Sequence, residues 1–173
     1  MIAFVILHYR AADMTRKCVE RIKALEGDKK IVIVDNASPN GTGQELLDEY
    51  TEDSEIKVIL NPENSGFAKG NNMGVRWVQE NVPADFVVVL NNDVEILQKD
   101  FCPKVEAIYR RHSFDVLGPD IISVFSGIHQ NPKSLHGYSL ESVRKKREKV
   151  ARTKNPILLL LSSGEKNSPA IWK

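Results

Sequence analysis

The sequence predicts an α/β fold with a mainly parallel sheet flanked by helices, and two patterns support this prediction. Four short runs rich in branched residues are nearly continuous in apolar side chains, as is usual for strands covered on both faces. The segments between and after them repeat apolar residues at helical spacing. The strand-like runs are residues 2–7, 31–34, 56–60 and 86–90, and the helical patterns cover residues 14–25, 46–50, 73–78 and 101–109. Because strand and helix alternate, we expect parallel strands joined by right-handed crossovers. A further strand is expected at residues 115–122.

Composition restricts the classes of function. The net charge of the 173-residue chain is +1, whereas nucleic-acid binders usually carry a strong basic excess, so we expect no nucleic-acid partner. Cys18 and Cys102 form no CxxC pair, which argues against zinc, and we expect both thiols to be reduced and packed. The apolar residues 1–7 lack a basic leader and end at His8, unlike a signal peptide or a membrane span. We therefore expect a cytoplasmic protein.

Polar loops follow all four predicted strands. In open parallel sheets, ligands bind beyond the carboxyl ends of the strands, so these loops should form one shared site. The loops are residues 8–10, 35–38, 61–66 and 91–93. In the second loop, Asp35 has two interpretations: it accepts hydrogen bonds from a base or ribose, or it closes a turn. In the last loop, Asp93 offers the hard oxygen ligand that Mg²⁺ or Mn²⁺ prefers.

Glycine recurs every four residues at the start of the third helical pattern, at Gly66, Gly70 and Gly74. Glycine costs about 1 kcal/mol in a helix interior, so this spacing indicates close approach of a ligand or of a neighbouring backbone. The start of the helix would also favour a diphosphate. The familiar nucleotide fingerprints are absent: residues 41–46 (GTGQEL) lack the last glycine of the dinucleotide motif, and there is no Walker A sequence.

Three motifs, in order and spacing, resemble family 2 glycosyltransferases with the GT-A fold, especially the bacterial rhamnosyltransferase-like branch. They are IVIVDNAS at residues 31–38, NPENSGFAKGNNMG at residues 61–74 and VLNNDV at residues 89–94. The resemblance covers about residues 1–132 and implies a nucleotide-diphospho-sugar transferase fold. Residues 1–132 would then be the donor-binding domain, and residues 133–173 the start of an acceptor region.

The resemblance also implies roles for individual residues. Asp93, in the family's DXD-type triplet, would hold Mg²⁺ or Mn²⁺ on the donor diphosphate. Asn92 would contact the ribose or a phosphate, and Asp35 the base. Asn91 stands where the family's triplet has aspartate, which makes the metal site less acidic. The residues predicted to bind the donor are Tyr9, Arg10, Asp35, Asn64, Gly66, Lys69 and Asn92.

The reaction implied by the resemblance is transfer of a sugar, with inversion, from a nucleotide-diphospho-sugar to a polysaccharide or lipid-linked acceptor. In the family, the general base belongs to an acidic pair in the second half. No such pair follows Asp120, so the catalytic residue stays unassigned and the acceptor half is expected to be largely missing. His129 has two interpretations, a ligand of donor or metal and a solvent-exposed loop residue; the second is favoured.

Residues 138–154 read as a basic helix and precede the apolar residues 157–161. One interpretation is a solvated helix followed by a segment that packs on absent residues, which predicts self-association through residues 139–161. The other is peripheral contact with an anionic membrane at the inner face of the plasma membrane.

Two other functions compete with glycosyl transfer. A sugar-nucleotide nucleotidyltransferase shares the sheet type and the metal dependence, but it usually has a glycine-rich basic loop after the first strand, and residues 8–12 contain no glycine. A non-catalytic nucleotide-binding remnant is favoured by the missing base.

Overall fold

The computed structural model describes residues 1–130, 141 and 144–145. Helices and strands alternate from the first strand to the last helix, as the sequence predicts. The strands are β1 (Ile2–His8), β2 (Lys29–Asp35), β3 (Ile56–Leu60) and β4 (Phe86–Asn91). The helices are α1 (Ala12–Lys23), α2 (Thr42–Tyr50), α3 (Phe67–Asn81) and α4 (Phe101–His112).

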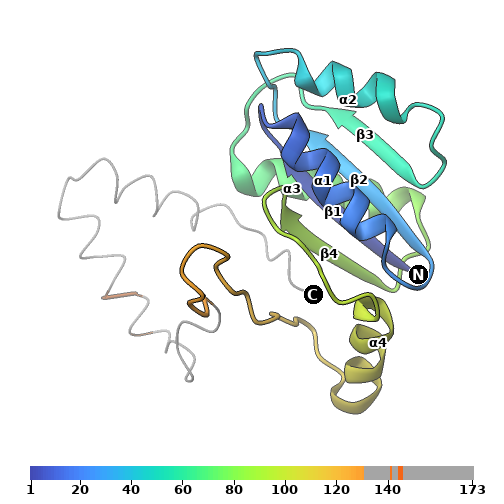
Figure 1. The fold of residues 1–173 in the computed structure, drawn as a ribbon, viewed down its shortest axis with the longest axis vertical. Coiled ribbons are helices and arrows are strands. Elements are labelled where there is room, and N and C mark those ends of the chain that lie inside the picture. Colours follow the sequence, from blue (N-terminus) through green and yellow to red (C-terminus); the bar gives the residue numbers. More distant parts are fainter. Residues whose placement is uncertain (131–140, 142–143, 146–173) are drawn as a thin grey trace. The chain divides into compact units, whose positions relative to one another are not determined.

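The four strands form one parallel sheet in the order β3-β2-β1-β4. Helices α1 and α2 lie on one face, and α3 packs on the other against β1 and β2 (Figure 1). The chain moves outward from β1 to β3 and then returns across the sheet to β4. The strand order therefore reverses between β1 and β4.

The two central strands form the core. Residues Ile2–Ile6 and Ile31–Val34 are almost completely buried, because helices cover both faces of β1 and β2. This confirms the interpretation of their apolar runs as doubly covered strands. The outer strands differ: Lys57 in β3 is exposed and residues 86–89 of β4 are only half-buried. Among the described strands, each outer strand has a neighbour on one side only.

The chain divides into two compact units, Met1–Ser113 and Phe114–Lys173. In the described part of the second unit, the prediction of a strand at residues 115–122 is wrong. Only an isolated bridge between Ile122 and His129 forms there. Gly118 and Pro119 interrupt this apolar run, and proline cannot donate a backbone hydrogen bond to a sheet. Nδ1 of His129 lies 2.7 Å from an Asp120 carboxylate oxygen, so its nearest partner is local.

Among the described residues, no helix has both the length and the apolar composition needed to span a bilayer. The predictions for the apolar residues 157–161 lie outside the described residues. So do those for residues 138–154, apart from Glu141, Arg144 and Lys145.

Both cysteines are unpaired and buried, as the sequence predicts. Burial, together with the nearby Asp93 and Glu95 carboxylates, raises the pKa of Cys18 to about 12. Burial also raises the pKa of Cys102. The thiolate is the reactive form, so we expect neither thiol of the native protein to react readily with Ellman's reagent at pH 8.

Both thiols should react once guanidinium chloride unfolds the chain, and this total provides the control. Fast reaction of either thiol in the native protein would show that its side chain opens to solvent far more often than the packing implies.

Candidate functional site

The carboxyl ends of the four parallel strands gather the predicted site residues at one edge of the sheet. Tyr9 and Arg10 follow β1, Asp35 ends β2, and Asn92 and Asp93 follow β4. The loop after β3 carries Asn64 and Gly66, and Lys69 lies in the first turn of α3. All the residues predicted to bind donor or metal therefore lie on the edge where such sheets bind ligands. Their individual roles stay predictions.

The loop after β1 is fixed through its backbone. Arg10 adopts a left-handed conformation with φ 66°, which non-glycine residues rarely adopt. Its N–H donates to Oγ of Ser38 at 2.8 Å, and its C=O accepts from Nδ2 of Asn40 at 2.9 Å. The Arg10 guanidinium lies 5.0 Å from the centre of the Tyr9 ring, within the range of a cation–π contact. The loop after β2 thus holds the backbone of Arg10, while the side chains of Tyr9 and Arg10 remain exposed.

Asp35 is 5% exposed and closes the turn that follows β2. The N–H of Ser38 donates to both carboxylate oxygens, at 3.3 and 3.2 Å. A Cβ built on Gly43, in the first turn of α2, would lie only 2.2 Å from one of these oxygens. The helix start favours a negative charge there. The turn interpretation of Asp35 is thus realised, and its contact with a base stays a prediction.

A cluster of amides joins the loops after β2 and β3. Oδ1 of Asn36 accepts from Nδ2 of Asn61 at 3.0 Å and from N–H of Ser65 at 3.2 Å. Nδ2 of Asn36 donates to Oδ1 of Asn64 at 3.0 Å, and that oxygen also accepts from N–H of Gly66 at 3.1 Å. The Asn64 oxygen is therefore used within the loop, which leaves its NH₂ group as the donor it can offer to a ligand.

The three glycines spaced four residues apart at the start of α3 lie in two different environments. Gly66 precedes the helix with φ 82°, and a Cβ there would meet no atom within 4 Å. Gly70 and Gly74 instead face the sheet: Cβ atoms there would lie 2.6 Å from Leu7 Cδ1 and 2.5 Å from Val5 Cγ1. The close approach that the spacing indicates is thus to strand side chains.

The loop after β4 is tied to α1. Nδ2 of Asn92 donates to Oγ1 of Thr15 at 3.1 Å. Glu95 forms ion pairs with Lys17 at 2.6 Å and with Arg21 at 3.1 Å. Between these two attachments, Asp93 is exposed, so its side chain is accessible on a loop that is held at both sides.

The described residues contain no group of three or more His, Cys, Asp or Glu side chains that could hold a metal ion. This donor set does not fit an all-protein metal cage. It does fit a cation of the Mg²⁺ type, which is commonly held by one or two carboxylates together with substrate phosphates and water. Asp93 is the carboxylate that the sequence predicts for this role.

His8 is completely buried at the end of β1, although the sequence places it in the loop. Its Nδ1 lies 2.7 Å from Oγ1 of Thr15 and its Nε2 lies 3.0 Å from Oγ1 of Thr42. Thr15 and Thr42 are not among the residues predicted for the site. One signal for Thr15 was present, because it lies at helical spacing from Cys18 and Ile22 and so interrupts the apolar stripe of α1.

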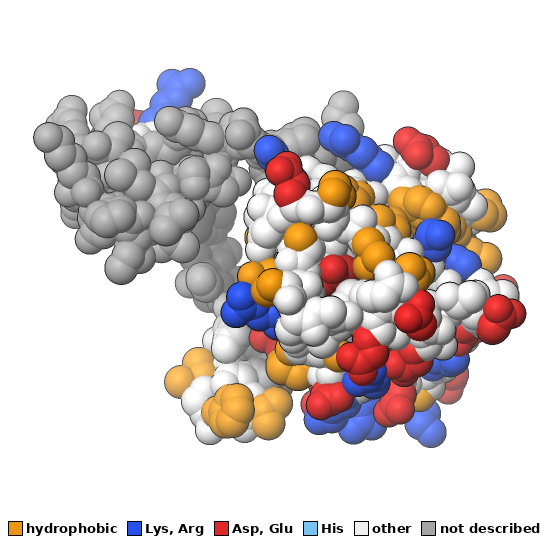
Figure 2. All heavy atoms as spheres, turned by 90° about the horizontal axis from the view of Figure 1, so that it is seen from above, with side chains coloured by type: hydrophobic (Ala, Val, Ile, Leu, Met, Phe, Trp, Pro, Cys, Tyr) orange, Lys and Arg blue, Asp and Glu red, His pale blue; other side chains and the backbone are white. Residues whose placement is uncertain are grey.

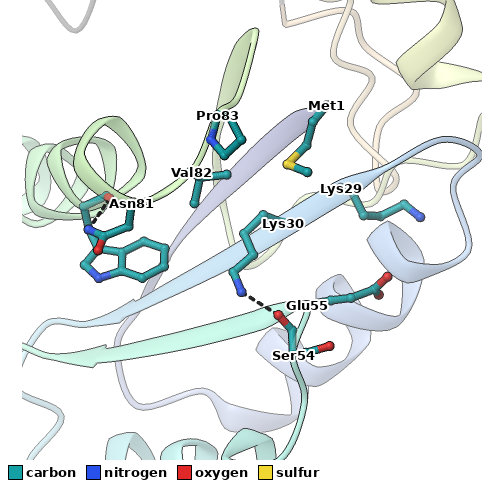
Figure 3. Close-up of a pocket in the computed structure, with 9 residues that line it drawn as sticks. Met1, Lys29, Lys30, Ser54, Glu55, Asn81, Val82 and Pro83 are labelled. Atoms are coloured by element: carbon teal, nitrogen blue, oxygen red, sulfur yellow. Dashed lines mark hydrogen bonds between the residues drawn. The ribbon is translucent and has the colours of Figure 1, made fainter.

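A shallow pocket with a volume of about 450 Å³ lies at the opposite, amino-terminal edge of the sheet (Figure 3). The ammonium group of Lys30 already donates to the C=O of Ser54 at 2.5 Å. None of the predicted site residues contributes to this pocket. Its lining residues are Met1, Lys29, Lys30, Ser54, Glu55, Trp77, Asn81, Val82 and Pro83.

Charges of both signs are mixed on the face drawn in Figure 2, with no broad basic patch among the described side chains. A group of opposite charges also links α1 to α2, where Arg16 pairs with Asp13, Glu45 and Glu49. On this face, the mixture of charges agrees with the near-neutral net charge of the chain.

The sequence profile described as "Glycosyl transferase family 2" matches residues 3–163. The chain belongs to this family. Among curated proteins, it is similar to the low-salt glycan biosynthesis hexosyltransferase Agl10 of Haloferax volcanii, with 26% identity over 122 residues. That match covers 70% of the chain and 37% of Agl10, so the chain spans little more than a third of this relative's length.

Solved structures of glycosyltransferases share the fold. Residues 1–349 of S. aureus TarS in complex with UDP match with a TM-score of 0.56 and 18% identity, over 70% of this chain and 38% of that one. The mannosyltransferase PcManGT from Pyrobaculum calidifontis, in complex with GDP-Man and Mn²⁺, matches with a TM-score of 0.56 and 18% identity, over 66% and 33%. These similarities confirm the predicted GT-A fold of this family 2 glycosyltransferase domain.

Proposed function

We propose that this chain is the donor-binding part of a glycosyltransferase that uses Mg²⁺ or Mn²⁺ to bind a nucleotide-diphospho-sugar. The observation that carries the proposal is the placement of the motif residues on one edge of the sheet, in a chain that belongs to family 2. The UDP complex of TarS and the GDP-Man and Mn²⁺ complex of PcManGT support the class of ligand.

Each loop contributes a different group to this proposed site. Tyr9 and Arg10 present an aromatic face and a guanidinium after β1, and Asp35 presents a carboxylate at the end of β2. From the loop after β3, Asn64 offers its NH₂ group, while Gly66 leaves room at the start of α3. Lys69, in the first turn of that helix, adds a cation suited to phosphate.

The loop after β4 would act on the leaving group. Cleavage of the bond between sugar and diphosphate builds negative charge on the departing nucleoside diphosphate. A divalent cation would neutralise this charge as it forms. Asp93 would hold that cation against the diphosphate, and Asn92 would contact the donor beside it.

Acceptor activation is a separate part of the proposal. A hydroxyl group of a polysaccharide or lipid-linked glycan would attack C1 of the sugar from the face opposite the leaving group and invert that carbon. A general base would remove its proton. Neither that base nor the acceptor site is assigned to a described residue. The contact of residues 138–154 with an anionic membrane likewise stays a prediction.

We expect the 173-residue chain to bind UDP, dTDP or GDP more tightly with Mn²⁺ than without it, and to transfer sugar at a rate near background. A general base contributes roughly 10²–10⁴-fold in rate, and orientation of the acceptor contributes about 7–11 kcal/mol in favourable cases. Calorimetry measures the binding, and release of nucleoside diphosphate from UDP-, dTDP- or GDP-sugars with added glycan acceptors measures the transfer.

Three outcomes separate the competing functions. Transfer by a longer gene product would support the glycosyltransferase, and binding without transfer by any product would support a non-catalytic nucleotide-binding protein. Pyrophosphate release from a nucleoside triphosphate and a sugar 1-phosphate would support a nucleotidyltransferase. If none of the three diphosphates binds with or without Mn²⁺, the proposed donor site is wrong.

A further inference from the structure

A chain of hydrogen bonds that passes through the buried His8 joins the loop after β1 to the loop after β4. It begins at Arg10, whose C=O can only accept and is bonded to Nδ2 of Asn40. That bond fixes the amide of Asn40, so its oxygen faces Oγ1 of Thr42 at 2.8 Å. The amide oxygen can only accept. The hydroxyl proton of Thr42 must therefore point at Asn40.

This direction determines the tautomer of His8. Because Thr42 has already used its one proton, its oxygen must accept from Nε2 of His8 at 3.0 Å. The proton of neutral His8 therefore lies on Nε2, and the Asp35 carboxylate, 3.9 Å from the same nitrogen, favours it there. Nδ1 of His8 is left as an acceptor.

The same reasoning continues to the loop after β4. Oγ1 of Thr15 lies 2.7 Å from the bare Nδ1 of His8, so Thr15 must donate to it. Its other contact, with the C=O of Ala11 at 3.2 Å, is longer. With its proton on the His8 side, Thr15 accepts from Nδ2 of Asn92 at 3.1 Å. The NH₂ group of Asn92, which also contacts the C=O of Ala11 at 3.5 Å, is thereby held on α1. Among the described residues, its Oδ1 is left to accept from a ligand.

We propose that His8 is a positioning residue which, through Thr15, holds the loop after β4 with the amide oxygen of Asn92 presented to the donor. This inference rests on the proposed function. It selects between the two contacts expected of Asn92, because a carbonyl oxygen accepts from a ribose hydroxyl and cannot donate to a phosphate. It also explains how a loop bearing the exposed Asp93 is connected to the loop that carries Arg10.

Charged groups around His8 act in both directions on its protonation. Burial lowers the pKa of His8, and Arg16 acts in the same direction, whereas Asp35 and Glu45 oppose it. A folded-state pKa below the unfolded value means that the unfolded chain binds the proton more readily. The His8 contribution to stability is therefore present above about pH 6.5 and is lost as the pH falls from there through the folded-state pKa.

The tautomer is tested without any ligand. In the full chain labelled with ¹⁵N-histidine, the His8→Gln variant identifies the His8 signals among those of the four histidines. We expect His8 to be mainly neutral at pH 6.5, where exposed histidines are half protonated, with the proton of the neutral ring on Nε2. A proton on Nδ1, or a charged His8 at this pH, would overturn the proposal whether or not a nucleotide binds.

The coupling to the loop is tested with Thr15→Val, which removes the hydroxyl but keeps the shape. Substitution of residues that orient metal ligands typically costs about 10–100-fold in metal affinity. In the presence of Mn²⁺, we expect Thr15→Val to bind about tenfold more weakly than wild type to the nucleoside diphosphate for which wild type has the highest affinity. Affinity without Mn²⁺ should change less, and Thr15→Ser, which restores the hydroxyl, should behave like wild type.

Thr51→Val is the matched control, because the Thr51 hydroxyl donates to the C=O of Leu47 at the exposed end of α2. Thermal unfolding of every variant separates loss of coupling from loss of fold. One outcome is that wild type binds diphosphate more tightly with Mn²⁺ while the folded Thr15→Val variant keeps the whole increase. In that case the positioning role proposed for His8 is wrong and the proposed function stands. If wild type binds no diphosphate, the proposed function fails and the histidine tautomer alone decides.

Discussion

Asp93→Ala should remove most of the increase in nucleoside diphosphate affinity that Mn²⁺ produces. The Asp93 carboxylate is exposed on a loop held by Asn92 on one side and Glu95 on the other. Loss of a residue that merely orients a metal ligand costs about 10–100-fold in metal affinity, so loss of the ligand itself should cost at least as much. Calorimetric titration of UDP, dTDP and GDP with and without Mn²⁺ measures the change.

Asp100→Ala is a matched control, because its carboxylate is also partly exposed and pairs with Lys104 at the start of α4. It should leave the Mn²⁺ effect unchanged. Asp93→Asn keeps an oxygen ligand and removes the charge, so its affinity should lie between those of alanine and wild type. Equal affinities for wild type and Asp93→Ala in Mn²⁺ would show that the metal, if bound, is held elsewhere.

The sheet could be predicted from the sequence because burial on both faces imposes a simple pattern. In β1 and β2, helices cover the side chains on both faces of the strand, so nearly every position must be apolar. The run at residues 115–122 also contains branched apolar residues, but in the described structure it forms only an isolated bridge. An apolar run alone therefore does not distinguish a strand from an irregular segment interrupted by Gly118 and Pro119.

The residue types of the site could be predicted, but the direction of each side chain could not. Asn64 was expected to contact the donor, yet its amide oxygen is bonded to Asn36 and to the N–H of Gly66. Hydrogen bonds of this kind depend on which loops become neighbours, and that information appears only when β2 and β3 pair. A motif thus identifies the edge of the sheet without stating which atom faces the ligand.

His8 shows the same limit in a buried position. A polar residue at the end of an apolar run looks like the first residue of a loop. Here the run continues through His8, because Thr15 on α1 and Thr42 on α2 bond both of its ring nitrogens. Burial of a polar ring is tolerated when its hydrogen bonds are satisfied. Neither partner is within six residues of His8, so no local pattern around it could reveal the arrangement.

Gly43→Ala should weaken both the fold and the binding of nucleoside diphosphate. A Cβ at this position would lie 2.2 Å from Oδ2 and 2.3 Å from Cγ of Asp35, so either the carboxylate or the start of α2 must move. That carboxylate is 5% exposed and is bonded to the N–H of Ser38. Overpacking typically costs about 1–3 kcal/mol, and displacement of Asp35 should lower affinity with and without Mn²⁺.

Gly74→Ala provides the comparison that assigns the loss of binding to Asp35. Its Cβ would lie 2.5 Å from Cγ1 of Val5 and 3.0 Å from Cγ2 of Val34, so it should lose stability for the same reason but keep its affinity. In a helix free of clashes, alanine is more stable than glycine by about 1 kcal/mol. The gain in helix propensity and the cost of the steric clash therefore have opposite signs in both variants. Urea unfolding measures the balance at both positions. A Gly43→Ala protein that is more stable than wild type and binds nucleoside diphosphate equally well would mean that Asp35 moves aside freely and that its buried position is not needed for the site.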